Sequence, residues 1–221
     1  MQESPKKKYA NVLTGEIIFL VIFFIGVSYL AHIYKVDLQE SLGDSIFSMI
    51  FYVFIFIVSV VAAPINSEPL IPVASAIWGW FLAGLLTLLG WTIGSLIAFI
   101  LARHYGLPLV KKFISLEKIT QLEKLIPEKH LFISVIFLRM TVQVDALSYI
   151  LGFLTTMKPR TYFVASLIGL APLAFLLAYI GEQPLVYQLI ALSIGLTILL
   201  TGLLLAWKKM NKRLEKNKIK K

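Results

Sequence analysis

Two oppositely charged residues stand six positions apart in an otherwise apolar stretch, FLRMTVQVDALSY at positions 137–149. Arg139 carries a planar guanidinium, which suits phosphate and carboxylate groups. Asp145 carries a carboxylate that can pair with an arginine or, when desolvated, hold a proton near neutral pH. Glu68, in the segment PINSEP, is a third charge inside an apolar region. These residue types predict either a buried ion pair or a site that binds an anionic group and moves a proton.

Three neighbouring residues have side chains that can hydrogen-bond to a bound head group: Gln143, Ser148 and Tyr149. We interpret them, together with Arg139, as candidate substrate ligands, although each alone is more often a contact between membrane helices. Glu68 and Asp145 are candidate proton carriers. The structural alternative is that Arg139 pairs with Glu68 or Asp145 and fixes one part of the chain to another without transporting anything.

The sequence gives little support to an enzyme. It lacks the short motifs of zinc hydrolases, phosphate-binding loops and serine hydrolases. It has no cysteine, and its three histidines are far apart, each near the end of an apolar segment. Glu68 and Asp145 are the one candidate carboxylate pair, and a nearby Arg139 would prevent them from sharing a proton. We therefore expect no catalytic residues, no metal and no cofactor.

The elements that position these charges are expected to be membrane helices. The 221 residues are 58% hydrophobic and 15% charged, with a mean hydropathy of +0.84. A bilayer crossing takes about 20 apolar residues. Five apolar segments reach or approach this length: 17–34, 46–63, 73–102, 161–181 and 185–207. The chain is therefore predicted to be an all-α polytopic membrane protein.

The positive charges predict which segments face the cytoplasm. Most of the 21 Lys and Arg residues lie in four polar segments: 1–15, 103–130, 157–161 and 207–221. Such segments remain inside the cell, whereas 35–44 and 182–184 carry acidic residues and are expected outside. The basic tail is interpreted as an anchor that attracts anionic lipid, not as a nucleic-acid site. We predict one membrane domain, 16–206, in the cell membrane, between a cytoplasmic N-terminus and a cytoplasmic C-terminal tail.

This topology requires two hairpins that enter the membrane and return on the same side. If 17–34 runs outwards, the chain must later reach the cytoplasmic 103–130. Prolines interrupt helices, so the proline-rich 64–72 predicts a hairpin that enters from outside, followed by a full span at about 84–102. Segment 131–156 lies between two basic segments and is too short for two crossings, which predicts a second hairpin from inside. About four full spans and two opposed re-entrant hairpins would enclose a polar cavity, as in inverted-repeat transporters.

Four motifs carry a resemblance to a known family: PINSE followed by IWG, LARHYG, FLRM, and LGFLTTMKPRTYFVASLIGLAP. Over about residues 60–182 the chain resembles the DedA superfamily, and within it the branch of SNARE-associated Golgi (VTT-domain) proteins. The resemblance implies two re-entrant hairpins with inverted symmetry and a role in lipid translocation, such as recycling of undecaprenyl phosphate. It makes Glu68 the acidic residue of the first hairpin tip and Arg139 the arginine of the F-x-R motif. The chain departs from the family at Val142 and Asp145, where the family often has a proline and a second arginine.

Three classes of function stay open at this point. The favoured one is translocation of an anionic lipid, a polyprenyl phosphate or a phospholipid, with or without proton coupling. The second is a proton-coupled exporter of a small solute, and the third is a membrane scaffold that transports nothing. Membrane lipids are the expected partners, and a homo-oligomer is left open.

Overall fold

The computed structural model describes residues 22–42, 45–62, 66–106, 130–141, 144–184 and 186–190, without the side chains at 141 and 144–146. The chain divides into two compact units, Met1–Glu182 and Gln183–Lys221. In the described part of the second unit, residues 186–190 are helical, and Gln188 Nε2 donates to the Gln183 carbonyl at 2.8 Å. The predicted limits of the membrane domain, 16 and 206, lie outside the described residues.

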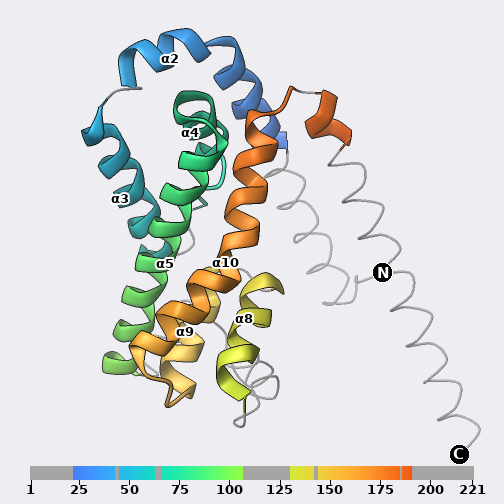
Figure 1. The fold of residues 1–221 in the computed structure, drawn as a ribbon. Helices are drawn as coiled ribbons and strands as arrows, with labels where there is room; N and C mark the ends of the chain where they lie inside the picture. The colour runs from blue at the N-terminus through green and yellow to red at the C-terminus, as the bar shows by residue number, and fades with distance from the viewer. Residues whose placement is uncertain are drawn as a thin grey trace, which may run out of the picture. The chain divides into compact units, whose positions relative to one another are not determined.

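The described part of the first unit is entirely helical apart from short connections (Figure 1). Its helices are Ile22–Ile33, α2 (Lys35–Leu42), α3 (Ile46–Ala62), α4 (Leu70–Trp78), α5 (Trp80–Tyr105), α8 (Leu131–Thr141), α9 (Val144–Leu154) and α10 (Pro159–Glu182). Among them, α5 and α10 are each long and apolar enough to cross a membrane. The prediction of an all-α membrane protein is confirmed.

Proline and glycine set the breaks around α4. Pro69 is the N-cap of this helix, and Pro72 lies in its first turn, where no main-chain N–H is needed for the helical ladder. The helix therefore resumes at Leu70, so the break predicted over 64–72 is shorter than expected. Gly79 has a φ of +79° between α4 and α5, a conformation that glycine adopts without strain.

Two hairpins are built alike and lie at opposite ends of the α5–α10 pair (Figure 1). The first consists of α3 and α4, and the second of α8 and α9. The first arm of each hairpin packs on the long helix that follows it, so α3 contacts α5 and α8 contacts α10. The second arm packs on the other long helix, so α4 contacts α10 and α9 contacts α5. This confirms two opposed hairpins in an inverted-repeat arrangement, while the count of four spans stays a prediction because 17–34 and 185–207 are only partly described.

Glycines let the first arms approach the long helices at equivalent places in the two repeats. A Cβ on Gly94 of α5 would lie 2.9 Å from the Val60 Cβ of α3. A Cβ on Gly169 of α10 would lie 2.7 Å from the Arg139 Cβ of α8. Small residues at such crossings allow the close backbone approach that stabilises membrane helix pairs. The two contacts place Arg139 in the second repeat where the first repeat has Val60.

Each hairpin has its own apolar core. The first-hairpin cluster consists of Tyr52, Phe56, Val60, Ile71, Ala74, Ala83, Leu88, Trp91, Leu170, Ala174 and Ala178. The second-hairpin cluster consists of Phe99, Val135, Leu147, Leu151, Met157, Tyr162 and Ala165. Both long helices contribute to both clusters, so α5 and α10 are the frame that carries the two hairpins.

Candidate functional site

Arg139 is the largest side chain that is almost fully buried among the described residues, with 1% of its surface exposed. It lies in the last turn of α8, an 11-residue helix that is otherwise apolar. Its Nη2 donates to Ser148 Oγ of α9 at 2.8 Å and to the Tyr162 hydroxyl of α10. Its Cζ also lies 5.3 Å from the centre of the Tyr162 ring, within the range of a cation–π contact. One guanidinium thus joins both arms of the second hairpin to a long helix.

Tyr162 is a site residue that the sequence analysis missed. It is fully buried, and its ring stacks on Phe99 of α5 with centroids 4.0 Å apart. It follows the basic segment KPR and is 23 residues from Arg139. The two residues lie on different helices, so helical periodicity in the sequence could not predict their contact. The guanidinium therefore contacts α10 directly, at Tyr162, and reaches α5 indirectly, because the Tyr162 ring stacks on Phe99.

Tyr149 joins the two hairpins to each other. It is 1% exposed on α9, and its hydroxyl donates to the Val61 carbonyl at the end of α3 at 2.5 Å. The structure therefore brings Ser148 to Arg139 and directs the adjacent Tyr149 to the first hairpin. Both residues were predicted to bind a head group, and their role in binding stays a prediction.

Glu68 lies at the turn of the first hairpin, beside a pair of bonded serines. The Oγ atoms of Ser59 and Ser67 are 2.9 Å apart, and they fix the turn against the end of α3. Glu68 Oε2 is buried and has no hydrogen-bond partner, and Glu68 forms no ion pair, within the part of the chain that the structure describes. An unbonded buried carboxylate oxygen costs about 1–3 kcal/mol or more, so this atom is suited to take a proton or a ligand.

The structure describes the remaining predicted site residues only in part. Gln143 and the side chain of Asp145 are outside the described residues, although the main chain places Asp145 in the first turn of α9. Pairing of Asp145 with Arg139 therefore stays a prediction. Among the described residues, no cluster of three or more His, Cys, Asp or Glu side chains could hold a metal ion.

Two charged side chains close the connections between the hairpins and the long helices. Near the end of α5, Arg103 donates to the carbonyls of Thr155 and Met157, both at 2.6 Å, just after α9. At the end of α10, Glu182 Oε2 accepts from the Trp80 N–H at 2.9 Å, at the start of α5. A cation at free carbonyls and a carboxylate at free N–H groups both match the helix dipole. From the sequence, Arg103 is predicted only to be one of the cytoplasmic charges of segment 103–130.

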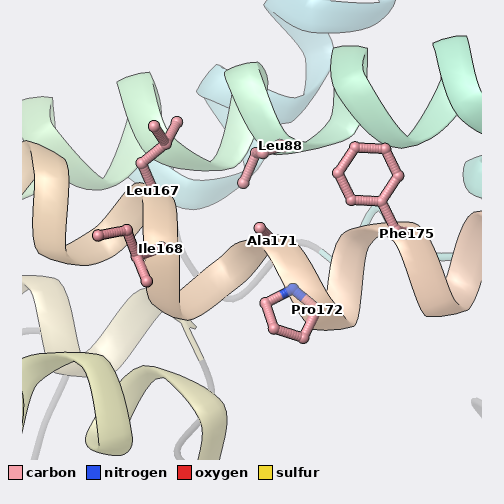
Figure 2. Close-up of a pocket in the computed structure, with 6 residues that line it drawn as sticks. All are labelled: Leu88, Leu167, Ile168, Ala171, Pro172 and Phe175. Atoms are coloured by element: carbon pink, nitrogen blue, oxygen red, sulfur yellow. The ribbon is translucent and has the colours of Figure 1, made fainter.

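An apolar groove of about 400 Å³ runs along the α5–α10 crossing. Figure 2 shows its lining side chains: Leu88 from α5, and Leu167, Ile168, Ala171, Pro172 and Phe175 from α10. Pro172 lies inside α10 and has no N–H, so it cannot complete the helical bond to the Ile168 carbonyl one turn earlier. The groove follows the helix where its hydrogen-bond ladder is interrupted.

These features define an α-helical membrane protein with two opposed re-entrant hairpins around a buried arginine. The family model of the VTT domain matches residues 64–183, which is more than half of the chain. The chain therefore belongs to the VTT-domain family, the domain of the DedA and SNARE-associated Golgi proteins. This confirms the resemblance seen over about 60–182. No curated protein and no solved structure gives a significant match.

Proposed function

We propose that this protein transports an anionic lipid, a polyprenyl phosphate or a phospholipid, across the cell membrane without changing it chemically. The observation that carries the proposal is the burial of Arg139 in a re-entrant hairpin. A charge at the bilayer centre costs about 2.5–3.5 kcal/mol on insertion scales and usually marks a substrate or ion pathway. The guanidinium fork can bind a phosphate through two parallel hydrogen bonds.

The contacts of Arg139 suggest how a head group is taken up. Its Nη2 bonds to the neutral hydroxyls of Ser148 and Tyr162. Phosphate oxygens carry negative charge, and hydrogen bonds to them are stronger than those to a neutral hydroxyl. An arriving phosphate can therefore compete with these two hydroxyls for Nη2. Because the hairpins enter from opposite ends, such a site can open to either leaflet in turn, as in other inverted-repeat transporters.

A second candidate function, proton-coupled export of a small solute, is supported by Glu68. Its buried Oε2 has no hydrogen-bond partner among the described residues, so protonation would relieve the cost of burying an anion. In both functions Glu68 or Asp145 would carry the proton. Glu68→Gln should then abolish the dependence of transport on a pH gradient, and unchanged coupling in this variant would exclude Glu68 as the carrier.

We also propose that both termini are cytoplasmic and that anionic membrane lipids are the partners. The absence of cysteine from the sequence makes this easy to test with single introduced cysteines. A cysteine in place of Glu182 should react with an impermeant thiol reagent added outside intact cells, and one in place of Lys158 should not. Labelling of position 158 from outside would contradict the proposed topology.

Reconstitution in liposomes tests the transport function. The assay follows a labelled polyprenyl phosphate or phospholipid by its accessibility in each leaflet. Arg139→Lys keeps the charge but loses the planar fork, so translocation should fall about tenfold or more while expression and insertion stay normal. Arg160→Lys, at an exposed position of α10, is the matched control and should behave as wild type. Full activity of Arg139→Lys would leave Arg139 with a structural role only.

A further inference from the structure

Among the described residues, two buried hydroxyls on the long helices lack hydrogen-bond partners. Thr92 of α5 and Ser166 of α10 are both 0% exposed. Neither Thr92 Oγ1 nor Ser166 Oγ has a hydrogen-bond partner within the part of the chain that the structure describes. Buried helix hydroxyls commonly bond to a carbonyl one turn earlier, as Ser75 does with Ile71 at 2.9 Å. An unbonded hydroxyl costs free energy in a protein interior, so a ligand that reaches either of these two and bonds to it would recover that cost.

Both hydroxyls lie between the two apolar cores. On α5, Thr92 stands between Trp91 of the first-hairpin cluster and Phe99 of the second. On α10, Ser166 directly follows the last residue of the second-hairpin cluster and precedes Leu170 of the first. Each of the two residues thus lies, on its own long helix, at the boundary between the two clusters.

Arg139 lies close to this boundary. Gly169 follows Ser166 by about one helical turn and faces the Arg139 Cβ, which a Cβ on Gly169 would approach to 2.7 Å. Tyr162, which receives a hydrogen bond from Arg139, precedes Ser166 by four residues and therefore lies on the same side of α10. Ser166 is thus flanked on α10 by Tyr162, which contacts the buried guanidinium, and by Gly169, which faces the Cβ of the same arginine.

The apolar groove covers the same stretch of the crossing. Leu88, which lines the groove, is one turn before Thr92 on the same side of α5. Leu167, which also lines it, follows Ser166 in the chain. Figure 2 shows Leu88 and Ala171 directed towards each other across the gap between α5 and α10. The rim of the groove is open, since Ile168 is 46% exposed on a helix long enough to span the membrane, so this rim faces lipid chains.

We propose that the α5–α10 crossing binds a single-chain lipid phosphate, with Thr92 and Ser166 as hydroxyl ligands of its head group and the groove as the seat of its hydrocarbon chain. This rests on the proposed transport of anionic lipid and adds the residues that select its head and tail. Hydroxyls donate well to phosphate oxygens, and the nearby guanidinium supplies positive charge. A groove lined by apolar side chains favours a hydrocarbon chain over a polar group.

The test measures binding of farnesyl phosphate to the purified full-length protein in detergent. Thr92→Val and Ser166→Ala should each weaken binding about tenfold, the effect of losing one hydrogen bond to a charged group. Without lipid, both variants should unfold at the wild-type temperature or above, because each removes an unbonded buried hydroxyl. Thr92→Ser keeps a hydroxyl and should retain most of the affinity.

Matched controls separate binding from folding. The Thr87 hydroxyl is also buried but lies 2.7 Å from the Tyr52 hydroxyl, so Thr87→Val should lower the unfolding temperature and leave the affinity unchanged. Ala171→Phe should fill the groove and weaken binding. Leu89→Phe adds similar bulk at an exposed position of α5 outside the groove and should not. Farnesol, which lacks the phosphate, should not distinguish wild type from Thr92→Val.

Two results would overturn the proposal: no binding of farnesyl phosphate by the wild type, or wild-type affinity in both Thr92→Val and Ser166→Ala. Wild-type affinity in Ala171→Phe would show that the groove does not bind the hydrocarbon chain of the lipid. Failure of the transport function appears differently. In that case the wild type binds farnesyl phosphate, the variants lose it, and wild-type liposomes still show no translocation.

Discussion

The connection from α4 to α5 and the connection from α9 to α10 hold equivalent places in the two repeats, but opposite charges close them. The first is a single glycine, Gly79, and Glu182 accepts from the N–H that follows it. The second spans residues 155–158, and Arg103 donates to its carbonyls. In each case the charged residue comes from the end of the long helix of the other repeat. The geometry is repeated while the charge is inverted.

The inversion agrees with the predicted orientation in the membrane. Arg103 begins a basic segment predicted to be cytoplasmic, and Glu182 begins a segment predicted to be outside. The two residues whose charges predict this orientation therefore also have a structural role, because each one satisfies main-chain groups at its own end of the α5–α10 pair. Mutations at the glycine contacts and at these connections show how far the two repeats are equivalent.

The largest effect is expected where a second arm crosses the long helix of the other repeat. A Cβ on Gly152 of α9 would lie 2.2 Å from the Phe99 carbonyl oxygen, whereas one on Gly181 of α10 would lie 2.8 Å from Pro72 Cα. Because main chain cannot move aside easily, Gly152→Ala should cost about 3 kcal/mol and Gly181→Ala less. Gly26→Ala, with no atom within 4 Å of the new Cβ, is the control. Thermal unfolding in detergent measures all three, and equal stability of Gly152→Ala and Gly26→Ala would contradict the packing.

A smaller effect is expected from the groups that satisfy the carbonyls at the ends of the second arms. Arg103 satisfies carbonyls after α9, and Gln39 Nε2 donates to the Ala76 carbonyl of α4 at 3.0 Å. Because Arg103 is exposed, solvent weakens its bonds, and Arg103→Ala should cost about 1–2 kcal/mol. Gln39→Ala should cost about 0.5–1 kcal/mol. A larger loss of stability for Gln39→Ala would show that the neutral contact is the stronger one.

The hydrogen bond between the hairpins should contribute about as much as one ordinary bond. Tyr149→Phe removes the donor to the Val61 carbonyl and keeps the ring, so the free energy of unfolding should fall by about 1 kcal/mol. Tyr179→Phe alters a tyrosine that is 49% exposed and should have no effect. If the two variants unfold alike, the Tyr149 hydroxyl does not stabilise the contact between the hairpins.

The smallest effect is expected at the connection before α5. Glu182→Gln keeps an oxygen that can accept from the Trp80 N–H and loses only the charge at the helix N-terminus. The change in stability should be a few tenths of a kcal/mol at low ionic strength. It should vanish in high salt, which a salt series of thermal unfolding would reveal. A loss that persists in high salt would point to a change in geometry.

The second hairpin was predictable because two simple constraints meet there. Segment 131–156 has basic residues at both ends and is too short for two crossings, and the structure has α8 and α9 within it. Arg139 and Ser148 were both named from the sequence because polar groups are rare in such a segment. Their hydrogen bond confirms that they lie together, whereas their part in binding stays a prediction.

The rest of the site depends on packing between distant helices. Tyr162 reaches Arg139 from another helix, and no periodicity in the sequence connects them. Thr92 and Ser166 look like ordinary small polar residues of membrane helices, and only the absence of a partner for each hydroxyl among the described residues sets them apart. Arg103 was counted as a topology signal, because charge patterns do not show which carbonyls a side chain will meet.

Each repeat provides the charged residue that bonds to the main chain of the other, and this determines when during synthesis the first repeat can be completed. The N–H of Trp80 and its acceptor in Glu182 are 102 residues apart. At about 5–20 residues per second, the ribosome adds the acceptor roughly 5–20 seconds after the donor. Until then the start of α5 enters the membrane without this partner, so the first repeat is completed only when the last turn of the second has been made. A chain truncated before Glu182 should therefore leave both repeats incomplete. The two repeats would then fold, or be degraded, as one unit and not independently.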